Sequence, residues 1–352
     1  MSMGSRATPL TAQPAARQAP GFRVRRSSTA SRLALVGFLA AVAVIALAPF
    51  WGSTSTTNSL VRFLALVCLA QMWNLLAGYA GLVSIGQQAY IGIGAYTLVY
   101  FGNEQGIDVF ICVALAGVVS AVLALPLAGI AFRLRGGYFA IGTWVIAEVC
   151  RLIVANTDTL GGGAGTSLTA VASYDPATRQ TYTLWVALAV GAGSVLLVWW
   201  LLRRPLGTAL TALRDSEPAA RALGVRVTRA KLGAYVVAAA GCGVAGAVIY
   251  LNLLRVQPGA AFSVNWTAFM IFIVVIGGIG TIEGPLLGAI VFFALQEWLA
   301  DLGATYLILL GVLAIVVTIK LPTGLWGFAA ERWNLSVFPT GRHLELDSKE
   351  DA

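Results

Sequence analysis

RRPLGTALTALRDSEPAARALGVRVTRAK, Arg203 to Lys231, is the only long polar interruption between apolar runs of membrane length. This stretch carries six Arg and one Lys against two acids, Asp215 and Glu217. Membrane proteins concentrate basic residues in the loops that stay in the cytoplasm. The stretch is therefore predicted to be a cytoplasmic segment joining two sets of membrane helices.

Local residue chemistry predicts two short helices in this segment. The first would run from about Leu206 to Arg214, before a break at Asp215 and Ser216. Ser216 can cap the second helix, and Pro218 suits its first turn, where the missing N–H would be unpaired anyway. Gly224 suits the exit of that helix.

The second short helix carries four small or modest side chains, which let a backbone sit close inside a groove on another protein. They are Ala219, Ala220, Ala222 and Leu223. The segment is thus predicted to dock on a partner. A basic loop that only fixes topology would have the same charge, so the segment alone leaves both interpretations open.

Composition places the rest of the chain in a membrane. Of 352 residues, 58% are hydrophobic and 11% are charged, whereas soluble domains carry roughly 25% charged residues. The net charge of +8 does not indicate nucleic acid, because the basic residues lie mostly in short loops and tails beside apolar runs. We expect an all-α, polytopic bundle of transmembrane helices.

Cysteine and histidine usage predicts no metal site and no catalytic site. The four cysteines lie inside apolar runs without the short spacings of zinc ligands. The single histidine, His343, lies in the polar C-terminal tail, so no Ser-His-Asp or Cys-His arrangement can form in the membrane. An enzyme is therefore the least favoured class.

Ten apolar segments are candidate membrane helices. They lie at about 33–50, 59–77, 82–101, 108–132, 137–155, 182–202, 232–254, 265–281, 285–300 and 304–321. Residues 1–32 are predicted to be a disordered cytoplasmic tail, 33–322 a transmembrane domain with its cytoplasmic segment at 203–231, and 323–352 a cytoplasmic C-terminal tail. Only Arg179 and Arg255 fall in outside loops, which puts both termini in the cytoplasm.

Two glycine-rich stretches are unlike continuous helices. They are GYAGLVSIGQQAYIGIGAYT, Gly78 to Thr97, and GGIGTIEGPLLGA, Gly277 to Ala289. Interrupted backbone at membrane depth lines a cavity or is buried in protein, and in transporters it marks the substrate path. Close helix packing for the first stretch, and a tight cytoplasmic turn for the second, are the alternatives.

Polar residues in these stretches are the predicted substrate path: Ser84, Gln87, Gln88 and the lone acid Glu283. Neutral amides and a hydroxyl can hydrogen-bond a zwitterion without trapping it. Glu148 and Arg151 are three apart on one helix and are expected to form a structural ion pair rather than a substrate contact. Gln71 and Asn74, also three apart, are expected to bond across helices. The outside loop, 156–181, would contact a binding protein or serve as a flexible link.

The chain resembles the LivH/LivM family of branched-chain amino acid ABC permeases, and is closer to LivM. The resemblance rests on GYAGLVSIGQQAY (78–90) with Gly94-Ala95-Tyr96, on YFAI (138–141), on 214–224, and on GGIGT (277–281) with Gly284-Pro285 and Gly288-Ala289. These matches occur in order between Asn74 and Lys320. In ABC importers, a Glu-Ala-Ala, three residues, then Gly marks the coupling helix; here Pro218 stands at the Glu position and Glu217 comes one residue early.

The resemblance implies a subunit of an ATP-driven importer in the bacterial inner membrane. Its partners would be a second, LivH-like permease, two ATPase subunits and an extracytoplasmic substrate-binding protein. The implied contacts with the ATPase are Arg214, Asp215, Glu217, Ala219, Ala220 and Gly224. A nucleotide-binding loop needs Lys after Gly, and no lysine here follows a glycine, so we expect the partners to bind and hydrolyse ATP and this chain to hold no cofactor.

Two alternatives stay open. The same family includes permeases for urea and short amides. A stand-alone secondary transporter or channel would need no ATPase, but would normally carry an intramembrane acid or histidine relay, for which this chain has few residues.

Overall fold

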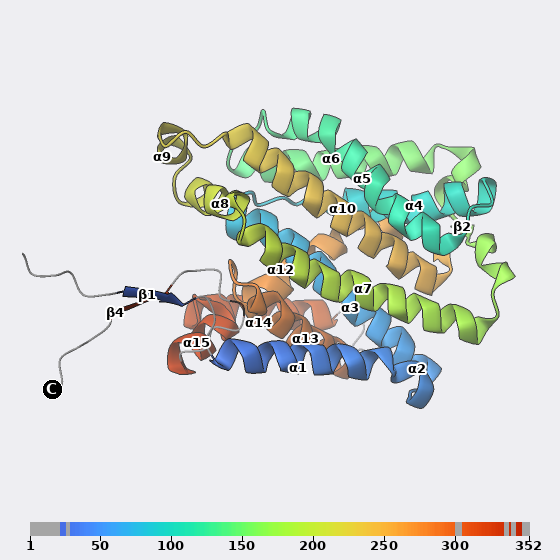
Figure 1. Cartoon of the computed structure of the whole chain (residues 1–352). Coiled ribbons are helices and arrows are strands. Elements are labelled where there is room, and N and C mark those ends of the chain that lie inside the picture. Colours follow the sequence, from blue (N-terminus) through green and yellow to red (C-terminus); the bar gives the residue numbers. More distant parts are fainter. Residues whose placement is uncertain (1–21, 26–28, 300–304, 334–337, 339–342, 347–352) are drawn as a thin grey trace, which may run out of the picture.

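The computed structural model describes residues 22–25, 29–299, 305–333, 338 and 343–346. These form a bundle of long helices with short connections, shown in Figure 1. The first half contains α1 (Thr29–Ala46), α2 (Ala48–Trp51), α3 (Thr54–Asn74), π-helical η1 (Leu75–Tyr79), α4 (Gln88–Thr97), π-helical η2 (Leu98–Glu104), α5 (Val109–Ala131) and α6 (Gly137–Ala155).

The outer loop and the second half follow. They contain η3 (Asp158–Leu160), η4 (Gly162–Ala164), β2 (Thr166–Ser167), η5 (Thr169–Ser173), α7 (Pro176–Leu202), α8 (Pro205–Asp215), α9 (Glu217–Ala222), α10 (Val227–Leu253), β3 (Arg255–Val256), α11 (Pro258–Ala261), α12 (Val264–Gly277), α13 (Glu283–Trp298), α14 (Thr305–Lys320) and α15 (Gly324–Trp333).

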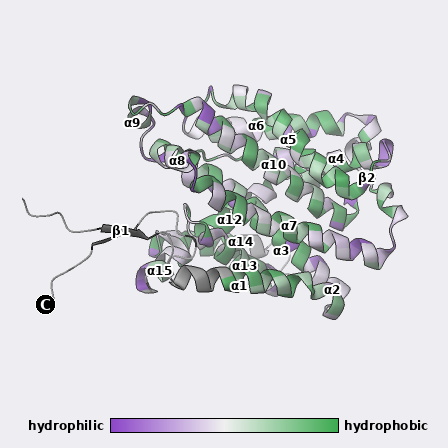
Figure 2. Ribbon diagram, in the orientation of Figure 1, coloured by the Kyte–Doolittle hydropathy of each residue, from purple (hydrophilic) through white to green (hydrophobic). Residues whose placement is uncertain are grey.

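Each of the ten predicted apolar segments contains a helix among its described residues, although the third is helical only from Gln88 and the eighth ends as a helix at Gly277. Among the described residues, seven helical segments are long and apolar enough to cross a membrane. The shorter apolar helices are α1, α4 with η2, and α13. Figure 2 shows hydrophobic residues along the helices and hydrophilic ones gathered toward the two ends of the bundle. The chain is a multi-pass membrane protein.

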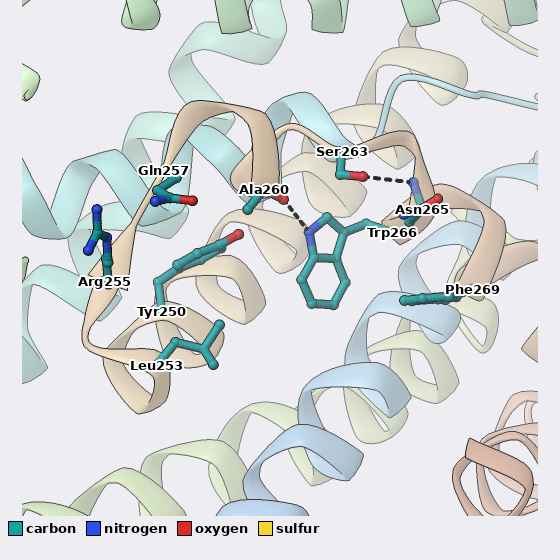
Figure 3. A pocket seen from close by; sticks show the side chains of 9 residues that line it. All are labelled: Tyr250, Leu253, Arg255, Gln257, Ala260, Ser263, Asn265, Trp266 and Phe269. Atoms are coloured by element: carbon teal, nitrogen blue, oxygen red, sulfur yellow. Dashed lines mark hydrogen bonds between the residues drawn. The ribbon is translucent and has the colours of Figure 1, made fainter. Parts of the chain in front are cut away.

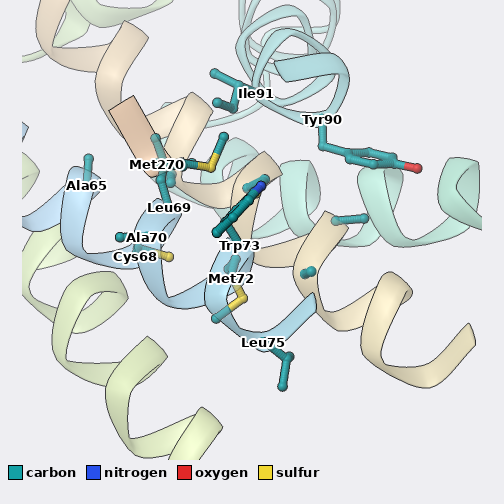
Figure 4. Close-up of a cluster of buried hydrophobic side chains, with 14 of the residues drawn as sticks. Ala65, Cys68, Leu69, Ala70, Met72, Trp73, Leu75, Tyr90, Ile91 and Met270 are labelled. Carbon is teal, nitrogen blue, oxygen red and sulfur yellow. The ribbon is translucent and has the colours of Figure 1, made fainter. Parts of the chain in front are cut away.

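The centre of the bundle is formed by α3 and α10. Their buried side chains meet those of α4 and α12, and Figure 4 shows Leu69, Met72 and Trp73 of α3 near Ile91 and Met270. Glycines bring α10 and α4 close together, since a Cβ at Gly94 would lie 1.9 Å from the Gly243 carbonyl oxygen. The predicted packing role is thus confirmed for Gly94, while the preceding residues 81–87 do form a break.

The N-terminal tail contains structure where disorder was predicted. Residues 1–21 and 347–352 lie outside the described residues, but β1 (Phe22–Arg25) pairs antiparallel with β4 (His343–Leu346). Helix α1 begins at Thr29, within the region predicted to be disordered, and α15 lies within the predicted C-terminal tail. Four-residue strands are too short to give a clear periodic pattern, which is why the prediction missed them.

The outside loop packs against the bundle. Its strand β2 pairs antiparallel with β3, which directly follows α10. The side chain of Asn103 at the end of η2 donates to the Ser167 carbonyl at 2.9 Å and accepts from the backbone of Thr169 and Ala170 at 2.9 and 3.0 Å. These contacts hold the loop against the end of the bundle that carries β3, rather than leaving it a free link.

Candidate functional site

The coupling segment, Arg203 to Lys231, forms the two predicted short helices. Helix α8 ends at Asp215 and α9 begins at Glu217, with Ser216 between them. Ser216 Oγ accepts a hydrogen bond from the Ala219 backbone N–H at 3.4 Å, so Ser216 caps α9 as predicted.

A glycine turn ends α9. Gly224 has a φ of +83°, in the left-handed region that glycine adopts at low cost. Its N–H donates to the Arg221 carbonyl, and the Val225 N–H donates to the Ala220 carbonyl, both at 3.0 Å. These bonds satisfy the last carbonyls of α9, and Leu223 just before the turn is 81% exposed.

One residue of the predicted docking face, Ala220, points into its own chain instead of toward a partner. Ala219, Ala222 and Leu223 are exposed, but Ala220 is fully buried within its own chain. Helix α9 packs beside α10, and a residue four positions before Gly224 falls on that inner side. The prediction that Ala220 enters a partner's groove is therefore replaced by one based on Leu223.

Glu217 also has partners within its own chain. It accepts from Lys231 Nζ at 2.6 Å and from Arg221 Nη2 at 3.1 Å. The bond with Lys231 is the main reason that the pKa of Glu217 lies below its usual value. Glu217 thus ties α9 to the first turns of α10.

Arg214 connects the coupling segment to the first glycine-rich stretch. Its Nη1 donates to the Gly78 carbonyl at 3.1 Å, and its Nε bonds Asp215 Oδ1 at 3.2 Å. A Cβ at Gly81 would lie 3.4 Å from Arg214 Cα, so the end of α8 touches the start of the broken stretch. Arg214 therefore contacts its own bundle, although it was predicted to contact the ATPase.

The second glycine-rich stretch reaches the same place. It is a turn between α12 and α13, residues 278–282. Asn74 Nδ2 donates to the Thr281 carbonyl at 2.7 Å, and Asn74 Oδ1 accepts from the Gly280 N–H at 2.9 Å. Gln71 Nε2 donates to the Ile282 carbonyl at 2.7 Å, which confirms that Gln71 and Asn74 bond across helices.

Gly280 completes this meeting point, because a Cβ there would lie 3.2 Å from Arg214 Nη1. We call Arg214, Gly78, Gly280 and Asn74 the Arg214 junction. It joins the coupling segment, the end of η1 and the α12–α13 turn. A displacement of α8 would therefore move contacts made by both glycine-rich stretches.

Three of the predicted path residues form a buried polar cluster at the break before α4. Ser84, Gln87 and Gln88 are at most 1% exposed. Ser84 Oγ accepts from Gln87 Nε2 at 3.3 Å, and Gln88 Oε1 accepts from Thr267 Oγ1 at 2.5 Å. Thr143 Oγ1 accepts from the Ile85 N–H at 3.1 Å. In this conformation the two amides and the hydroxyl all bond within the chain.

Thr143 and Thr267 were not predicted. Each is a single threonine within an apolar helix, α6 or α12, and threonine in such a helix commonly bonds its own backbone. Only the fold brings these hydroxyls to the broken stretch.

Glu283 occupies a different position. It begins α13, directly after the turn that Asn74 holds, and is half-buried. One carboxylate oxygen accepts from the Phe338 backbone N–H at 2.7 Å. Glu283 therefore lies beside the Arg214 junction, while Ser84, Gln87 and Gln88 lie at the break before α4.

A cavity of about 540 Å³ opens on the coupling-segment side of this break. The broken stretch lines it with Gly81, Leu82 and Val83, and the loop between α5 and α6 with Arg135. Lys231 and Arg221 also line it, together with Glu217, which pairs with both. This cavity places Arg135 and the Glu217 ion pairs next to the end of the broken stretch that adjoins the coupling segment.

A second hollow, of about 590 Å³, lies at the other end of α10 (Figure 3). Its lining is Tyr250, Leu253, Arg255, Gln257, Ala260, Ser263, Asn265, Trp266 and Phe269. Trp266 Nε1 donates to the Ala260 carbonyl at 3.0 Å. Arg255 is the one charged side chain in this lining, which combines a cation with aromatic and aliphatic walls. Sequence reasoning noted Arg255 only as an outside charge.

Among the described residues, no group of three or more His, Cys, Asp and Glu side chains could hold a metal ion. The polar groups of the two cavities and of the buried cluster suit hydrogen bonding and charge pairing.

Comparisons with known proteins agree with this arrangement. Residues 55–318 match the family described as branched-chain amino acid transport system / permease component. The chain is 32% identical to LivM, a high-affinity branched-chain amino acid transport system permease protein, of Salmonella typhimurium, over 82% of this chain and 74% of LivM. For LivM of Escherichia coli the identity is 31%, with the same coverage.

A shorter match, 32% identical over 35% of this chain and 40% of the relative, is to the ribose import permease protein RbsC of Bacillus subtilis. No solved structure matches the chain. The family match covers well over half of the chain and includes the coupling segment, both glycine-rich stretches and the membrane helices between them. The chain therefore belongs to the family of permease components of branched-chain amino acid transport systems.

Proposed function

We propose that this chain is the permease subunit of an ATP-driven importer of branched-chain amino acids in the bacterial plasma membrane, with both termini in the cytoplasm. The relatives named LivM support the substrate class. The Arg214 junction carries the proposal, because one arginine at the end of α8, the helix that leads into the exposed α9, contacts both glycine-rich stretches. A permease whose energy comes from ATP hydrolysis in another subunit needs a physical connection between its docking surface and its membrane helices.

The partners in this proposal are a second, LivH-like permease, two ATPase subunits and an extracytoplasmic binding protein. The ATPase subunits would bind and hydrolyse ATP, and this chain would hold no cofactor. Beside α9 lies a hollow of about 620 Å³ lined by Arg135, Glu217, Pro218, Arg221 and Ala222, in which Glu217 already pairs with Arg221. We infer that an ATPase subunit seats Leu223 in an apolar groove and sets acidic groups against the two arginines.

Transport would then follow from movement of α9. Closure of the ATPase pair pushes α9 and α8, and Arg214 passes the displacement to Gly78 and to the α12–α13 turn. For this push to do work, the ATPase pair must bind the two states of the permease with different free energies. In the open state, Ser84, Gln87 and Gln88 exchange their partners within the chain for the substrate.

The outer hollow is the proposed receiving site. The Arg255 guanidinium can pair with the carboxylate of an amino acid. Leu253, Trp266 and Phe269 offer apolar contact to an aliphatic side chain. The adjoining β2–β3 pair of the outer loop is a surface on which the binding protein could deliver its substrate.

Replacing Leu223 by Asp tests the docking step. A charge at this exposed position would have to be buried in the ATPase groove, so we expect the ATPase subunits to be lost when the complex is purified. Leu223→Met keeps the apolar contact and should retain them. If Leu223→Asp is inserted in the membrane and still co-purifies with the ATPase subunits as the wild type does, α9 is not the docking site.

A further inference from the structure

Helix α6 has the least contact with its own bundle of the seven long apolar segments. Only 17% of its most apolar part is buried, against 83% for α3 with η1. The buried side chains are Phe139, Thr143 and Ala147, a single stripe with a spacing of four residues. The opposite side of the helix is therefore free of contact with this chain.

Glu148 lies on that opposite side and pairs with Arg151, which follows Ala147 by four residues and is partly buried. Arg151 Nε donates to both carboxylate oxygens of Glu148 at 2.9 Å, and Arg151 Nη2 donates to Oε1 at 2.5 Å. The two side chains are 30% and 47% exposed, respectively. Val145 and Leu152, which lie three before and four after Glu148, share its face and are also exposed.

The pair lies within the membrane-spanning length, in the half of α6 nearer Ala155, with Glu148 seven residues and Arg151 four residues from that end. Glu148 is roughly 16 Å along α6 from Gly137, at about 1.5 Å per residue. Arg151 is nearer the outer end, but its guanidinium bends one turn deeper to reach Glu148 instead of extending toward the outer surface. Neither charge escapes to the membrane surface in this arrangement.

Two other poorly covered helices differ in this respect. The exposed large side chains of α5 are Ile111, Val118, Val122, Leu123, Leu125 and Ile130. Those of α14 are Ile308, Leu309, Val312, Ile315, Val316 and Ile319. The exposed side chains of α5 are apolar, as a face toward lipid should be, and those of α14 are apolar except for Thr305, Thr318 and Lys320 near its ends. Charged side chains in membrane helices are costly in lipid and almost always face protein or a watery cavity.

We propose that the face of α6 formed by Ile141, Val145, Glu148 and Leu152, the α6 face, is covered by the second permease chain of the transporter, with Arg151 at its edge. Only a membrane-embedded partner can reach this depth, which excludes the ATPase subunits and the binding protein. Polar groups of that partner, or water held between the two chains, would solvate the ion pair. This inference rests on the proposed function, which assumes that the transporter contains two permease chains.

Site-specific photo-crosslinking in membranes that contain the complete transporter tests this assignment. A photoreactive phenylalanine analogue replaces Val145 or Leu152 on the α6 face. Val118 on α5 and Ile315 on α14 are the matched controls, exposed apolar positions on faces without charge. We expect the α6 positions, and not the controls, to give a cross-link whose second chain is identified by mass spectrometry as a permease.

Cross-linking at the α6 positions no higher than at the controls would overturn the proposal, as would cross-links only to an ATPase subunit or the binding protein. ATP-dependent uptake, measured in the same membranes, shows that each variant is assembled. Uptake that needs no ATPase would defeat the proposed function while a permease cross-link still supported the α6 face. ATP-dependent uptake without that cross-link would defeat the α6 proposal alone.

Discussion

Replacing Arg214 by Ala is the sharpest test of the Arg214 junction. The change removes the hydrogen bond to the Gly78 carbonyl, and a bond from a charged donor contributes about 1.5–3 kcal/mol. Because the Arg214 side chain is 42% exposed, water competes for it, and we take the lower value of about 1.5 kcal/mol. If the bond exists in only one state of the transport cycle, its loss changes the equilibrium constant between that state and the others about tenfold.

The assay is leucine uptake by proteoliposomes that contain the permeases and ATPase subunits, with binding protein and ATP supplied. We expect the Arg214→Ala transporter to import about tenfold less leucine per ATP hydrolysed, because about 1.5 kcal/mol corresponds to about a tenfold change. The variant should keep its ATPase subunits. Arg229, an exposed arginine of the same segment, is the control, and Arg229→Ala should import normally. The junction has no coupling role if Arg214→Ala matches the wild-type ratio, or if lost ATPase subunits account for all its lost uptake.

Three further predictions follow from the site and the fold. Arg255→Gln should raise the KM for leucine uptake several-fold, because a pairing with the substrate carboxylate worth about 1 kcal/mol is lost. Arg179→Gln changes the other outside arginine and should leave the KM unchanged. Equal KM values for the two variants would show that the outer hollow is not part of the path. Because the pKa of Glu217 is lowered in the folded state, its pairing stabilises the protein above the ordinary pKa of about 4.3, and this contribution disappears as the pH falls through the lower folded value. Thermal unfolding in detergent should therefore show Glu217→Gln less stable than wild type at neutral pH, with the gap closing in acid; a gap that is independent of pH would contradict the pairing. Gly94→Ala should lower stability by about 1–3 kcal/mol through overpacking, while Gly193→Ala, where a Cβ would meet nothing within 4 Å, should not; similar unfolding temperatures for both variants would contradict the packing argument.

Local features of the sequence were enough to predict the membrane helices and the coupling segment. Apolar length located each membrane segment, because a helix of about 20 residues is needed to cross the bilayer. The cap at Ser216 and the turn at Gly224 depend on neighbouring residues only, so both are readable from sequence. The Glu148–Arg151 pair was predictable for the same reason.

Contacts between distant parts of the chain were not predictable in this way. Arg214 and Gly78 are 136 residues apart, and nothing near either residue identifies the other as its partner. The side of α9 that faces α10 depends on how the two helices pack, which is why Ala220 was assigned to the wrong surface. Thr267 has no local signal at all, and only the bundle places it beside Gln88.

Uptake by reconstituted transporter, with and without the ATPase subunits, is the most direct test of the central claim. The account predicts that proteoliposomes import leucine only when ATPase subunits, ATP and binding protein are all present, and that urea or short amides do not compete. Leucine uptake that persists without the ATPase subunits, driven by a gradient alone, would contradict it.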